Sequence, residues 1–330
     1  AGIAPARRAD FSLRPGAYYG GDTGNIFAVL DGELEGDPVI FCAHMDVVEP
    51  GSGKKSIVEE DGTIHSAGDT VLGADDISGI LEILYGVQLV IDSGKPHKKI
   101  EILFTIGEEL YVKGSDVFDY SKVTAKQAYV LDLSGAVGDA ARRAPSIRGK
   151  AAHAGFEPER GIHAIAVAAE AVTRLSMGHV DEDTTFNIGT INGGTATNIV
   201  PDSCVVTGEI RSYDHSKALE YVKNTEKIFA EEADKAGATA EVTHQVHLVA
   251  YETPVESRTV KDFLKACEKT GLPGTLTETF GGSDNNSFAK HGIEGLVLSC
   301  GMYQAHSTNE YTKIKDLYDG AELIHTLIEL

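Results

Sequence analysis

The feature of this sequence that most constrains its fold is an alternation of short apolar runs with a segment of helical periodicity. Two nearly continuous apolar runs, Asn25–Leu30 and Pro38–Ala43, precede Ile77–Ile91, whose apolar residues recur at helical spacing. The polar, glycine-rich stretch Glu49–Gly68 between them predicts a loop. Two further apolar runs follow at Ile100–Ile106 and Ala128–Leu133. Because continuous apolar runs are typical of strands buried on both faces, this order predicts an α/β domain with a mostly parallel sheet and helices on both faces.

The order of elements changes near residue 144 and changes back near residue 253. Between these points the sequence predicts strand, helix, two strands, helix and strand, which is the ferredoxin-like α+β order. The expected strands are Ile147–Ala152, Thr185–Ile191, Cys204–Arg211 and Ala240–Tyr251, and the expected helices are Ile162–Leu175 and Ser216–Ala236. Helix and strand alternate again at Val260–Thr270, Gly295–Ser299 and Ile314–Ile328. We therefore predict an α/β domain of residues 1–144 and 254–330, interrupted by a smaller domain of residues 145–253.

The composition limits the partners and the compartment of this chain. Its 330 residues include 29 Lys and Arg against 50 Asp and Glu, a net charge of −21, which argues against nucleic acid or an anionic membrane surface as a partner. Its four cysteines form no CxxC pair and predict buried free thiols of a reducing compartment. No apolar run reaches transmembrane length and no signal-peptide pattern opens the chain, so we expect a cytoplasmic protein.

Polar side chains follow the apolar runs of the predicted α/β domain. Ligands of open parallel sheets bind beyond the carboxyl ends of the strands, so a site is expected at these positions. The residues are His44, Asp46, the pair Glu108-Glu109, Asp132 and His306, with the pair Asp75-Asp76 opening the first helix. Each has a plainer explanation on its own, such as a helix N-cap for Asp75 or Asp76, a turn for Asp132 and a solvated loop for the glutamates. Their arrival at one edge of the sheet favours a common site.

Carboxylates and imidazoles that converge in this way predict a site for one or two divalent metal ions of the zinc type. Without a cation the carboxylates would repel one another. His44 and Asp46 share a face of their strand, as expected of a ligand and the carboxylate that orients it. Because adjacent residues point in different directions, one of Glu108 and Glu109 faces the metals while the other faces a water and acts as general base for hydrolysis.

Five motifs carry a resemblance to a known family. They are HMD at residues 44–46, LGADD at 72–76, GEE at 107–109, VLD at 130–132 and AHSTNEY at 305–311. In this order they resemble the dinuclear-zinc metallopeptidase family that includes peptidase T, carboxypeptidase G, aminoacylases and succinyl-diaminopimelate desuccinylase. The form LGADDxxG, with GTATNIVPD and FGGSDNNSF, is most similar to the peptidase T-like branch. One departure is Ile77, which replaces the lysine usual after the paired aspartates in that branch.

The resemblance implies a set of metal ligands. It implies two ions per chain, zinc with manganese or cobalt as alternatives, and Asp75 as the bridge between them. His44 and Asp132 would bind one ion, and Glu109 and His306 the other. It further implies that Glu108 is the general base and that Asp46 orients His44.

The predicted inserted domain resembles the lid of this family, which usually also forms the homodimer. Within it, His153 in GKAAHAG matches the histidine that stabilises the oxyanion, often from the neighbouring subunit. Asn198 and Arg211 match positions that hold the substrate backbone or carboxylate, and Gly281 and Gly282 match a loop that lets the substrate approach. On the residues alone, the plainer explanations are favoured, namely that His153 is a histidine at a strand end and that Arg211 is a surface partner of Glu209.

The expected activity is metal-dependent hydrolysis of peptide or amide bonds, most simply by an aminopeptidase or tripeptidase-like enzyme acting on a small peptide. An N-acyl-amino-acid deacylase or a carboxypeptidase could use the same residues. A metal-binding dimeric scaffold without catalysis is the alternative from another class. The intact pair Glu108-Glu109 argues against the scaffold, because a binding module needs no base beside the water.

Overall fold

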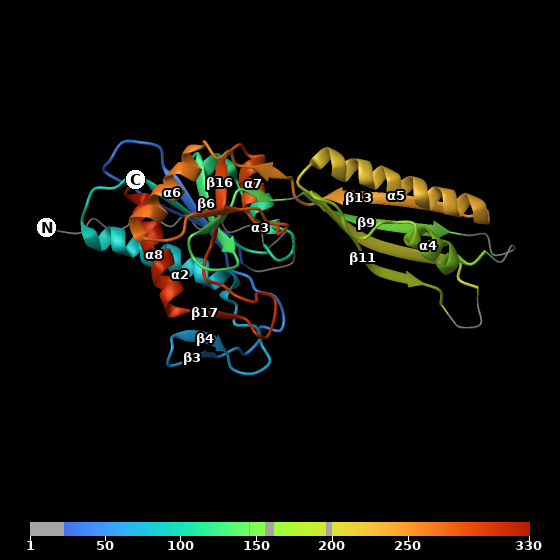
Figure 1. The fold of residues 1–330 in the computed structure, drawn as a ribbon, viewed down its shortest axis with the longest axis horizontal. Helices are drawn as coiled ribbons and strands as arrows, with labels where there is room; N and C mark the ends of the chain where they lie inside the picture. The colour runs from blue at the N-terminus through green and yellow to red at the C-terminus, as the bar shows by residue number, and fades with distance from the viewer. Residues whose placement is uncertain (1–22, 145, 156–161, 196–199) are drawn as a thin grey trace. The chain divides into compact units, whose positions relative to one another are not determined.

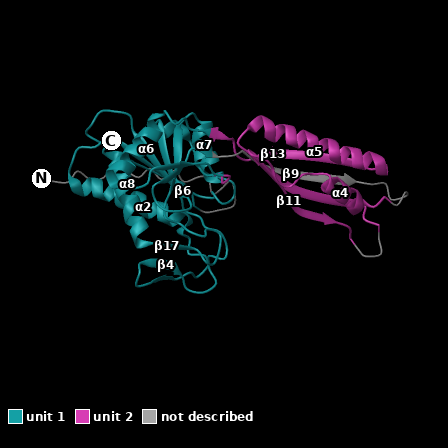
Figure 2. Ribbon diagram, viewed as in Figure 1, with its two compact units in different colours: residues 1–143, 252–279, 283–330 teal, residues 144–251, 280–282 magenta. Residues whose placement is uncertain are grey.

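The computed structural model describes residues 23–144, 146–155, 162–195 and 200–330, and for residues 144 and 146–155 it describes the backbone alone. These residues form two compact units (Figures 1 and 2). Unit 1 comprises the chain up to Arg143 together with Glu252–Thr279 and Ser283–Leu330, and unit 2 comprises Ala144–Tyr251 and Phe280–Gly282. The domain limits expected from the sequence, residues 145 and 253, concern independent folding and stay a prediction.

Unit 1 is built around a sheet whose central strands are parallel (Figure 1). Across the sheet the strands follow the order β1 (Ile26–Leu30), β5 (Ile100–Thr105), β2 (Val39–His44), β6 (Gln127–Leu133), β16 (Glu294–Ser299), β7 (Asp139–Ala141) and β15 (Thr275–Thr277). β2 pairs in parallel with β5 and β6, and β6 pairs in parallel with β16. The antiparallel pairs, β1 with β5 and β7 with β16, lie toward the edges. The predicted α/β class is confirmed.

Helices cover this sheet and complete its core. The long ones are α2 (Ala74–Ser93), α6 (Arg258–Thr270) and α8 (Ile314–Ile328), and the short ones are α3 (Lys113–Asp116), α7 (Asn285–Lys290) and a 3₁₀ turn at Tyr120–Lys122. Fully buried side chains such as Phe41, Ile83 and Phe263 join strands and helices in one cluster, and burial of each contributes roughly 1.5–3 kcal/mol. α2 and α8 approach closely at Gly86, where a Cβ would lie 2.7 Å from Ile324.

A hairpin occupies part of the stretch predicted as a loop, Glu49–Gly68. β3 (Ser56–Val58) pairs antiparallel with β4 (Thr63–Ser66), and β17 (Tyr311–Lys313) pairs with the other side of β4. The loop prediction was wrong there because the two strands have only three and four residues, and the strand that completes the sheet comes from the end of the chain.

Unit 2 has the predicted ferredoxin-like order with one added strand. Its elements are β9 (Ser146–Gly155), α4 (Ala164–Thr173), β10 (Gly178–Asp181), β11 (Thr184–Gly193), β12 (Ser203–Ser212), α5 (His215–Ala236) and β13 (Thr239–Val246). The strands lie in the order β10-β11-β12-β9-β13, and all these pairs are antiparallel. The strand predicted at Ala240–Tyr251 ends early, because β14 (Tyr251–Glu252) pairs with β8 (Arg143–Ala144) instead.

Two further expectations concern burial. All four cysteines, at positions 42, 204, 267 and 300, are free thiols in buried positions, as the sequence predicts. Among the described residues, no helix combines the length and the apolar character needed to cross a membrane.

Candidate active site

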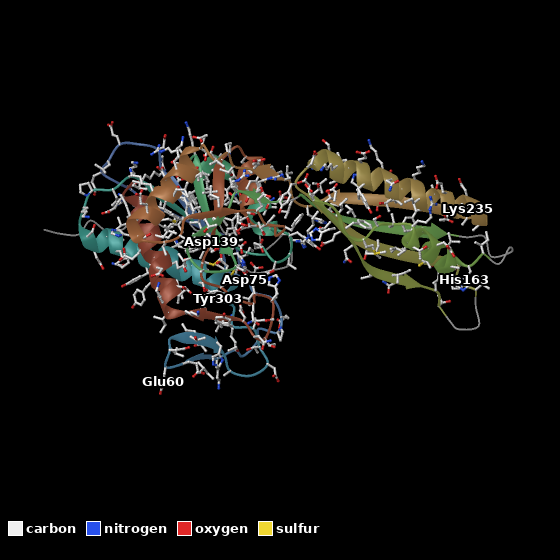
Figure 3. The ribbon with its side chains drawn as sticks, in the orientation of Figure 1. Glu60, Asp75, Asp139, His163, Lys235 and Tyr303 are labelled. Carbon is white, nitrogen blue, oxygen red and sulfur yellow. The ribbon has the colours of Figure 1, made fainter. Side chains whose placement is uncertain are left out.

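The carboxyl ends of the parallel strands in unit 1 carry the residues selected from the sequence. His44 is the last residue of β2 and lies opposite Thr105, the last residue of β5. The others are Glu108 and Glu109 in the loop after β5, Asp132 in β6, Asp75 in the first turn of α2 (Figure 3) and His306 in the loop before β17. The topology therefore brings together residues that are up to 262 positions apart, since the motifs run from residue 44 to residue 306.

Asp75 lies between the two imidazoles. Its Oδ1 is 2.9 Å from Nε2 of His44, and its Oδ2 is 3.2 Å from Nε2 of His306. Nε2 of His306 is also 3.0 Å from Oε1 of Glu109, and Nε2 of His44 is 3.8 Å from Oδ1 of Asp132. One carboxylate thus faces two separate nitrogen donors, each with a further carboxylate beside it. This arrangement of donors suits two adjacent divalent ions bridged by Asp75.

Glu108 reaches the same cluster from its other side. The donor atoms form two sets, and within each set all atoms lie within 4.8 Å of one another. One set comes from His44, Asp75 and Glu109, and the other comes from His44, Glu108 and Asp132. The side chain of Glu109 is only 12% exposed. The paired glutamates are therefore part of the cluster, which argues against a solvated loop at this position.

The carboxylate of Asp46 holds the backbone of the glutamate pair. Its Oδ1 accepts a hydrogen bond from the amide of Glu108 at 3.1 Å, and its Oδ2 accepts one from the amide of Glu109 at 3.2 Å. Nδ1 of His44 is 2.9 Å from the main-chain carbonyl of Asp46 and 3.6 Å from its carboxylate. The nearer acceptor for His44 is thus the carbonyl, and the carboxylate chiefly fixes the segment that carries Glu108 and Glu109.

Burial and neighbouring charges shift the ionisation of this cluster. Burial raises the pKa of Glu108 and of Asp132 well above the usual range of carboxyl groups. Burial alone would lower the pKa of His44, but hydrogen bonds with two neighbouring aspartates raise it well above its usual value. Hydrogen bonds with its two carboxylate neighbours raise the pKa of His306 to about 10. The cluster therefore stabilises positive charge at its centre.

The protein itself supplies little of that charge. Among the described residues, no lysine or arginine forms an ion pair with Asp46, Asp75, Glu108, Glu109 or Asp132. The donors are carboxylate oxygens and imidazole nitrogens, the set that zinc-type ions prefer. The residues present fit a pair of divalent ions.

Unusual backbone conformations lie beside the cluster. In the described part of the chain, the non-glycine residues with positive φ are Tyr111, Val112, Gln304 and His306. The first two follow the glutamate pair, and the last two lie in the loop that presents the second imidazole. A left-handed conformation costs such residues roughly 1–2 kcal/mol, and it is typical of sites where the surrounding structure enforces it.

Three further buried carboxylates near the cluster were not selected from the sequence as site residues: Asp76, Asp284 and Glu310. Asp76, expected beside Asp75 at the start of the helix but given no role there, accepts hydrogen bonds from the amides of His44 at 3.0 Å and Gly79 at 3.2 Å. Asp284 accepts hydrogen bonds from the Thr105 hydroxyl and, at 3.6 Å, from a cysteine thiol. Asp284 and Glu310 belong to the motifs FGGSDNNSF and AHSTNEY, which were the available signal.

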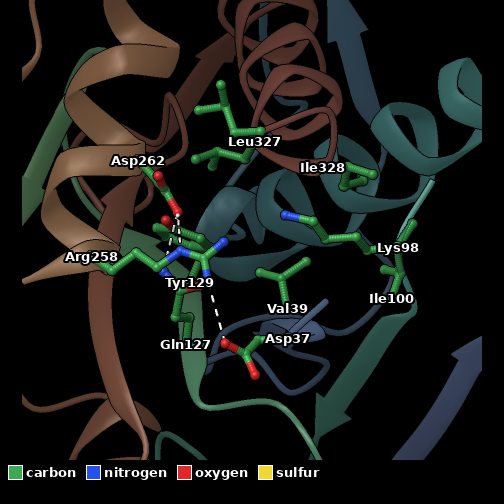
Figure 4. Close-up of a pocket in the computed structure, with 11 residues that line it drawn as sticks. Asp37, Val39, Lys98, Ile100, Gln127, Tyr129, Arg258, Asp262, Leu327 and Ile328 are labelled. Carbon is green, nitrogen blue, oxygen red and sulfur yellow. Dashed lines mark hydrogen bonds and ion pairs between the residues drawn. The ribbon is translucent and has the colours of Figure 1, made fainter. Parts of the chain in front are cut away.

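The amino ends of the same strands line a small cavity of about 20 Å³ (Figure 4). Arg258 reaches a carboxylate oxygen of Asp37 at 3.3 Å and one of Asp262 at 3.2 Å. The amide of Gln127 also donates to Asp262 at 3.3 Å. Both carboxylates of this cavity are therefore paired with a cation of the protein, and the space holds about one water molecule.

The residues predicted to hold the substrate belong mostly to unit 2. Nε of Arg211 is 3.0 Å from a carboxylate oxygen of Glu209, so the ion pair considered from the sequence is present. Its Nη1 also donates to the carbonyl of Phe280 at 2.8 Å, beside Gly281 and Gly282. Two predicted site residues lie outside the described set, namely the side chain of His153, whose backbone is in β9, and the whole of Asn198.

Comparisons with known proteins identify the family of this chain. A family model described as "Peptidase family M28" matches residues 25–159, and one described as "Peptidase dimerisation domain" matches residues 137–237. The protein YqjE of Bacillus subtilis, described as uncharacterized, is 38% identical over 94% of this chain and 85% of its own length. The aminopeptidase PepT of Bacillus cereus has a TM-score of 0.88 at 34% identity, covering 98% of this chain and 87% of that one. The chain belongs to the M20 family of dinuclear metallopeptidases.

Within the M20 family the chain is of the peptidase T type. A tripeptidase of Staphylococcus aureus has a TM-score of 0.91 at 30% identity over 98% of this chain and 87% of that chain. Peptidase T of Clostridium botulinum is 27% identical over 80% of this chain, and the match spans 66% of that protein's length. The family resemblance inferred from the five motifs is confirmed.

Proposed function

We propose that this M20 metallopeptidase is an aminopeptidase or tripeptidase-like enzyme that hydrolyses small peptides at a two-zinc site. The observation that carries the proposal is the position of Asp75, whose two oxygens face His44 and His306 at 2.9 and 3.2 Å. Two similar solved structures are named an aminopeptidase and a tripeptidase, which supports this substrate class.

The proposed ligands divide into two groups that share Asp75. His44 and Asp132 hold one ion, and Glu109 and His306 hold the other, in agreement with the pairs of donors that lie together. When bound, the ions polarise the scissile carbonyl and lower the pKa of the attacking water. Zinc is the proposed metal, with manganese or cobalt as alternatives, because the donors are imidazoles and carboxylates.

Glu108 is the proposed general base. It lies within 4.8 Å of both His44 and Asp132, measured between donor atoms, and the proposed division of ligands assigns it to neither ion. Burial raises its pKa well above the usual glutamate value when no cation is bound. It would take the proton of the attacking water and pass it to the leaving amine nitrogen.

Unit 2 supplies the proposed substrate contacts and a dimer interface. Arg211, Asn198 and the pair Gly281-Gly282 would hold the substrate backbone or carboxylate, and His153 would stabilise the oxyanion. The match of residues 137–237 to a peptidase dimerisation domain supports a homodimer. We further propose a cytoplasmic location, from the four buried free thiols.

The main alternative is an N-acyl-amino-acid deacylase or carboxypeptidase that uses the same ions and the same base. A metal-binding scaffold is disfavoured, because Glu108 lies in the cluster and the proposed ligand sets leave it available as a base. The enzymatic alternatives differ in whether the substrate must have a free amino terminus.

A substrate screen tests the proposal. The purified protein is loaded with zinc, manganese or cobalt and assayed against di- and tripeptides, matched N-acetylated peptides and N-acyl amino acids. We expect the protein to cleave tripeptides and to leave the matched N-acetylated peptides uncleaved. Preference for N-acyl amino acids would favour the alternative, and a protein that binds fewer than two ions or stays active without metal would refute the two-ion site.

Mixed dimers test the role of His153. If this residue acts across the dimer, co-expressed His153→Ala and Glu108→Gln chains with different tags should recover part of the activity in purified heterodimers. An inactive, correctly assembled heterodimer would place His153 in the site of its own subunit or outside any site.

A further inference from the structure

Glu310 binds the backbone beside the proposed bridging ligand. Its Oε1 accepts a hydrogen bond from the amide of Asp75 at 2.9 Å, and its Oε2 accepts one from the amide of Gly73 at 2.6 Å. The residue is 2% exposed. Both carboxylate oxygens are therefore occupied by main-chain donors of the segment that leads into α2.

The same loop contacts Asp75 at two points. His306, four positions before Glu310, lies 3.2 Å from Oδ2 of the Asp75 side chain. Glu310 holds the Asp75 backbone at 2.9 Å. A ligand of one proposed ion and the bridge between both ions are thus fixed to each other by a side-chain contact and a main-chain hydrogen bond.

A buried carboxylate that made only a structural contact at this place would destabilise the folded protein. Buried charge requires compensation, and Glu310 adds a negative charge close to an acidic cluster. Among the described residues it forms no ion pair with a lysine or arginine, and its hydrogen-bond donors are two amides. Only a carboxylate offers two equivalent acceptors to two amides, and hydrogen bonds to an ionised acceptor are about twice as strong as neutral ones.

We propose that Glu310 is a positioning residue that fixes the backbone of Asp75 so that its two oxygens face both metal ions. The inference rests on the proposed function, because it takes Asp75 as the bridging ligand. It assigns Glu310 no contact with substrate or metal. Its effect is exerted through the affinity of both ions.

Two other carboxylates repeat this arrangement and place Glu310 in a series. Asp76, next to the bridging ligand, accepts the amide of His44. Asp46, two residues after His44, accepts the amides of Glu108 and Glu109. Each of three ligand-bearing segments thus contributes a carboxylate that holds the backbone of another ligand-bearing segment. Glu310 is the member of this series that lies farthest along the chain from the ligand of its own segment, four positions after His306.

The test compares Glu310→Gln with a matched control. Glu101 is also buried in unit 1 and accepts two consecutive amides, those of Thr124 and Ala125, but it lies near the amino end of β5. Unlike Glu310 it also pairs with Lys99 at 2.8 Å, so its substitution sets an upper limit on the structural loss. In Glu310→Gln the amide group can accept only one of the two hydrogen bonds. Zinc affinity is measured by competition with a chelator of known affinity, and thermal unfolding is measured with and without zinc.

Glu310→Gln is expected to lower the affinity for both zinc ions by about 10–100-fold, as for other residues that support metal ligands. Its metal-free unfolding temperature should fall no further than that of Glu101→Gln, which should bind both ions as the wild type does. Wild-type affinity in Glu310→Gln, weakening of a single ion, or equal weakening in both variants would overturn the inference.

A second variant and the wild-type protein keep these outcomes separable. If Glu310→Gln does not fold, Glu310→Asp keeps the charge but is one methylene shorter, and it should also weaken both ions. Failure of the wild-type protein to bind two ions would instead refute the proposed function itself, and Glu310 would then have no bridging ligand to position.

Discussion

The two ends of the sheet in unit 1 treat charge in opposite ways. At the amino end, Arg258 lies between Asp37 and Asp262, so each carboxylate there has a cationic partner from the protein (Figure 4). At the carboxyl end, five carboxylates gather around two imidazoles, and no described lysine or arginine pairs with them. Both carboxylates at the amino end thus have a cation of the protein beside them, whereas the carboxylates at the carboxyl end require cations from outside.

The two ends of the sheet therefore contribute differently to the stability of unit 1. An ion pair that is half exposed contributes little to the free energy of unfolding, so substitutions at the amino end should change stability only slightly. A buried group of carboxylates without cations is unstable by repulsion, and metal ions convert that repulsion into binding energy. Changes at the carboxyl end should therefore affect chemistry strongly, and changes at the amino end should affect stability weakly.

The largest expected effect is that of Glu108→Gln. Loss of the proposed base should lower kcat by about 10²–10⁴-fold while both ions remain bound, because glutamine keeps the shape of the side chain. Metal content by elemental analysis and steady-state kinetics measure the two properties separately. Glu109→Gln is the matched control and should lose metal affinity as well, and a Glu108→Gln enzyme with normal kcat would remove Glu108 from its role.

Asp46→Asn should have an intermediate effect. The amide group can accept only one of the hydrogen bonds from Glu108 and Glu109, so the glutamate segment should shift and catalysis or metal affinity should fall about 10–100-fold. Kinetics at saturating zinc distinguish the two losses. An unchanged kcat and zinc affinity would show that the carboxylate does not support the site.

A substitution at Glu82 should increase stability. Both of its carboxylate oxygens are buried and have no hydrogen-bond partner among the described residues. Burial, and then the charges of Asp76 and Asp316, raise its pKa well above the usual value. Glu82→Met should raise the free energy of unfolding at neutral pH by roughly 1–3 kcal/mol.

The pH dependence of that gain has a definite sign. A carboxyl whose pKa is raised in the folded state does not lower the free energy of unfolding through its charge below its unfolded pKa of about 4.3. As the pH rises from there toward the folded pKa, the free energy of unfolding of the protein decreases. The advantage of Glu82→Met should therefore shrink toward acid pH. Urea unfolding between pH 4 and pH 8 measures it, and an advantage that is independent of pH would indicate packing rather than charge.

The smallest effect is expected at the amino end. Arg258→Met should lower the free energy of unfolding by at most about 1 kcal/mol, because its ion pairs are partly exposed. Zinc affinity and kcat should not change. A large loss of activity in this variant would contradict the separation between the two ends of the sheet.

Several site residues could be predicted because strand ends and helix starts have strong local signals. His44 follows a continuous apolar run, and Asp75 opens a helix of clear periodicity. The rule that ligands bind beyond the carboxyl ends of parallel strands then brings them together. The structure places their side chains within hydrogen-bond distance of each other.

Other features have no local signal. Glu310 lies in a polar stretch, and the amides it binds are 235 and 237 positions away, so its sequence surroundings resemble those of a solvated charge. The acceptor nearest to His44 is a main-chain carbonyl, which no side chain reports. The β3–β4 hairpin was missed for the same reason, since its third strand comes from a distant part of the chain.

The buried cysteines make this chain its own reporter of local opening. Cys42, Cys267 and Cys300 lie in unit 1 and Cys204 lies in unit 2, and none of these thiols is exposed in the folded state. A thiol reagent can therefore react only when the surrounding region opens. Labelling rates followed by peptide mass spectrometry would give separate opening free energies for the two units in a single unmodified protein, with and without metal.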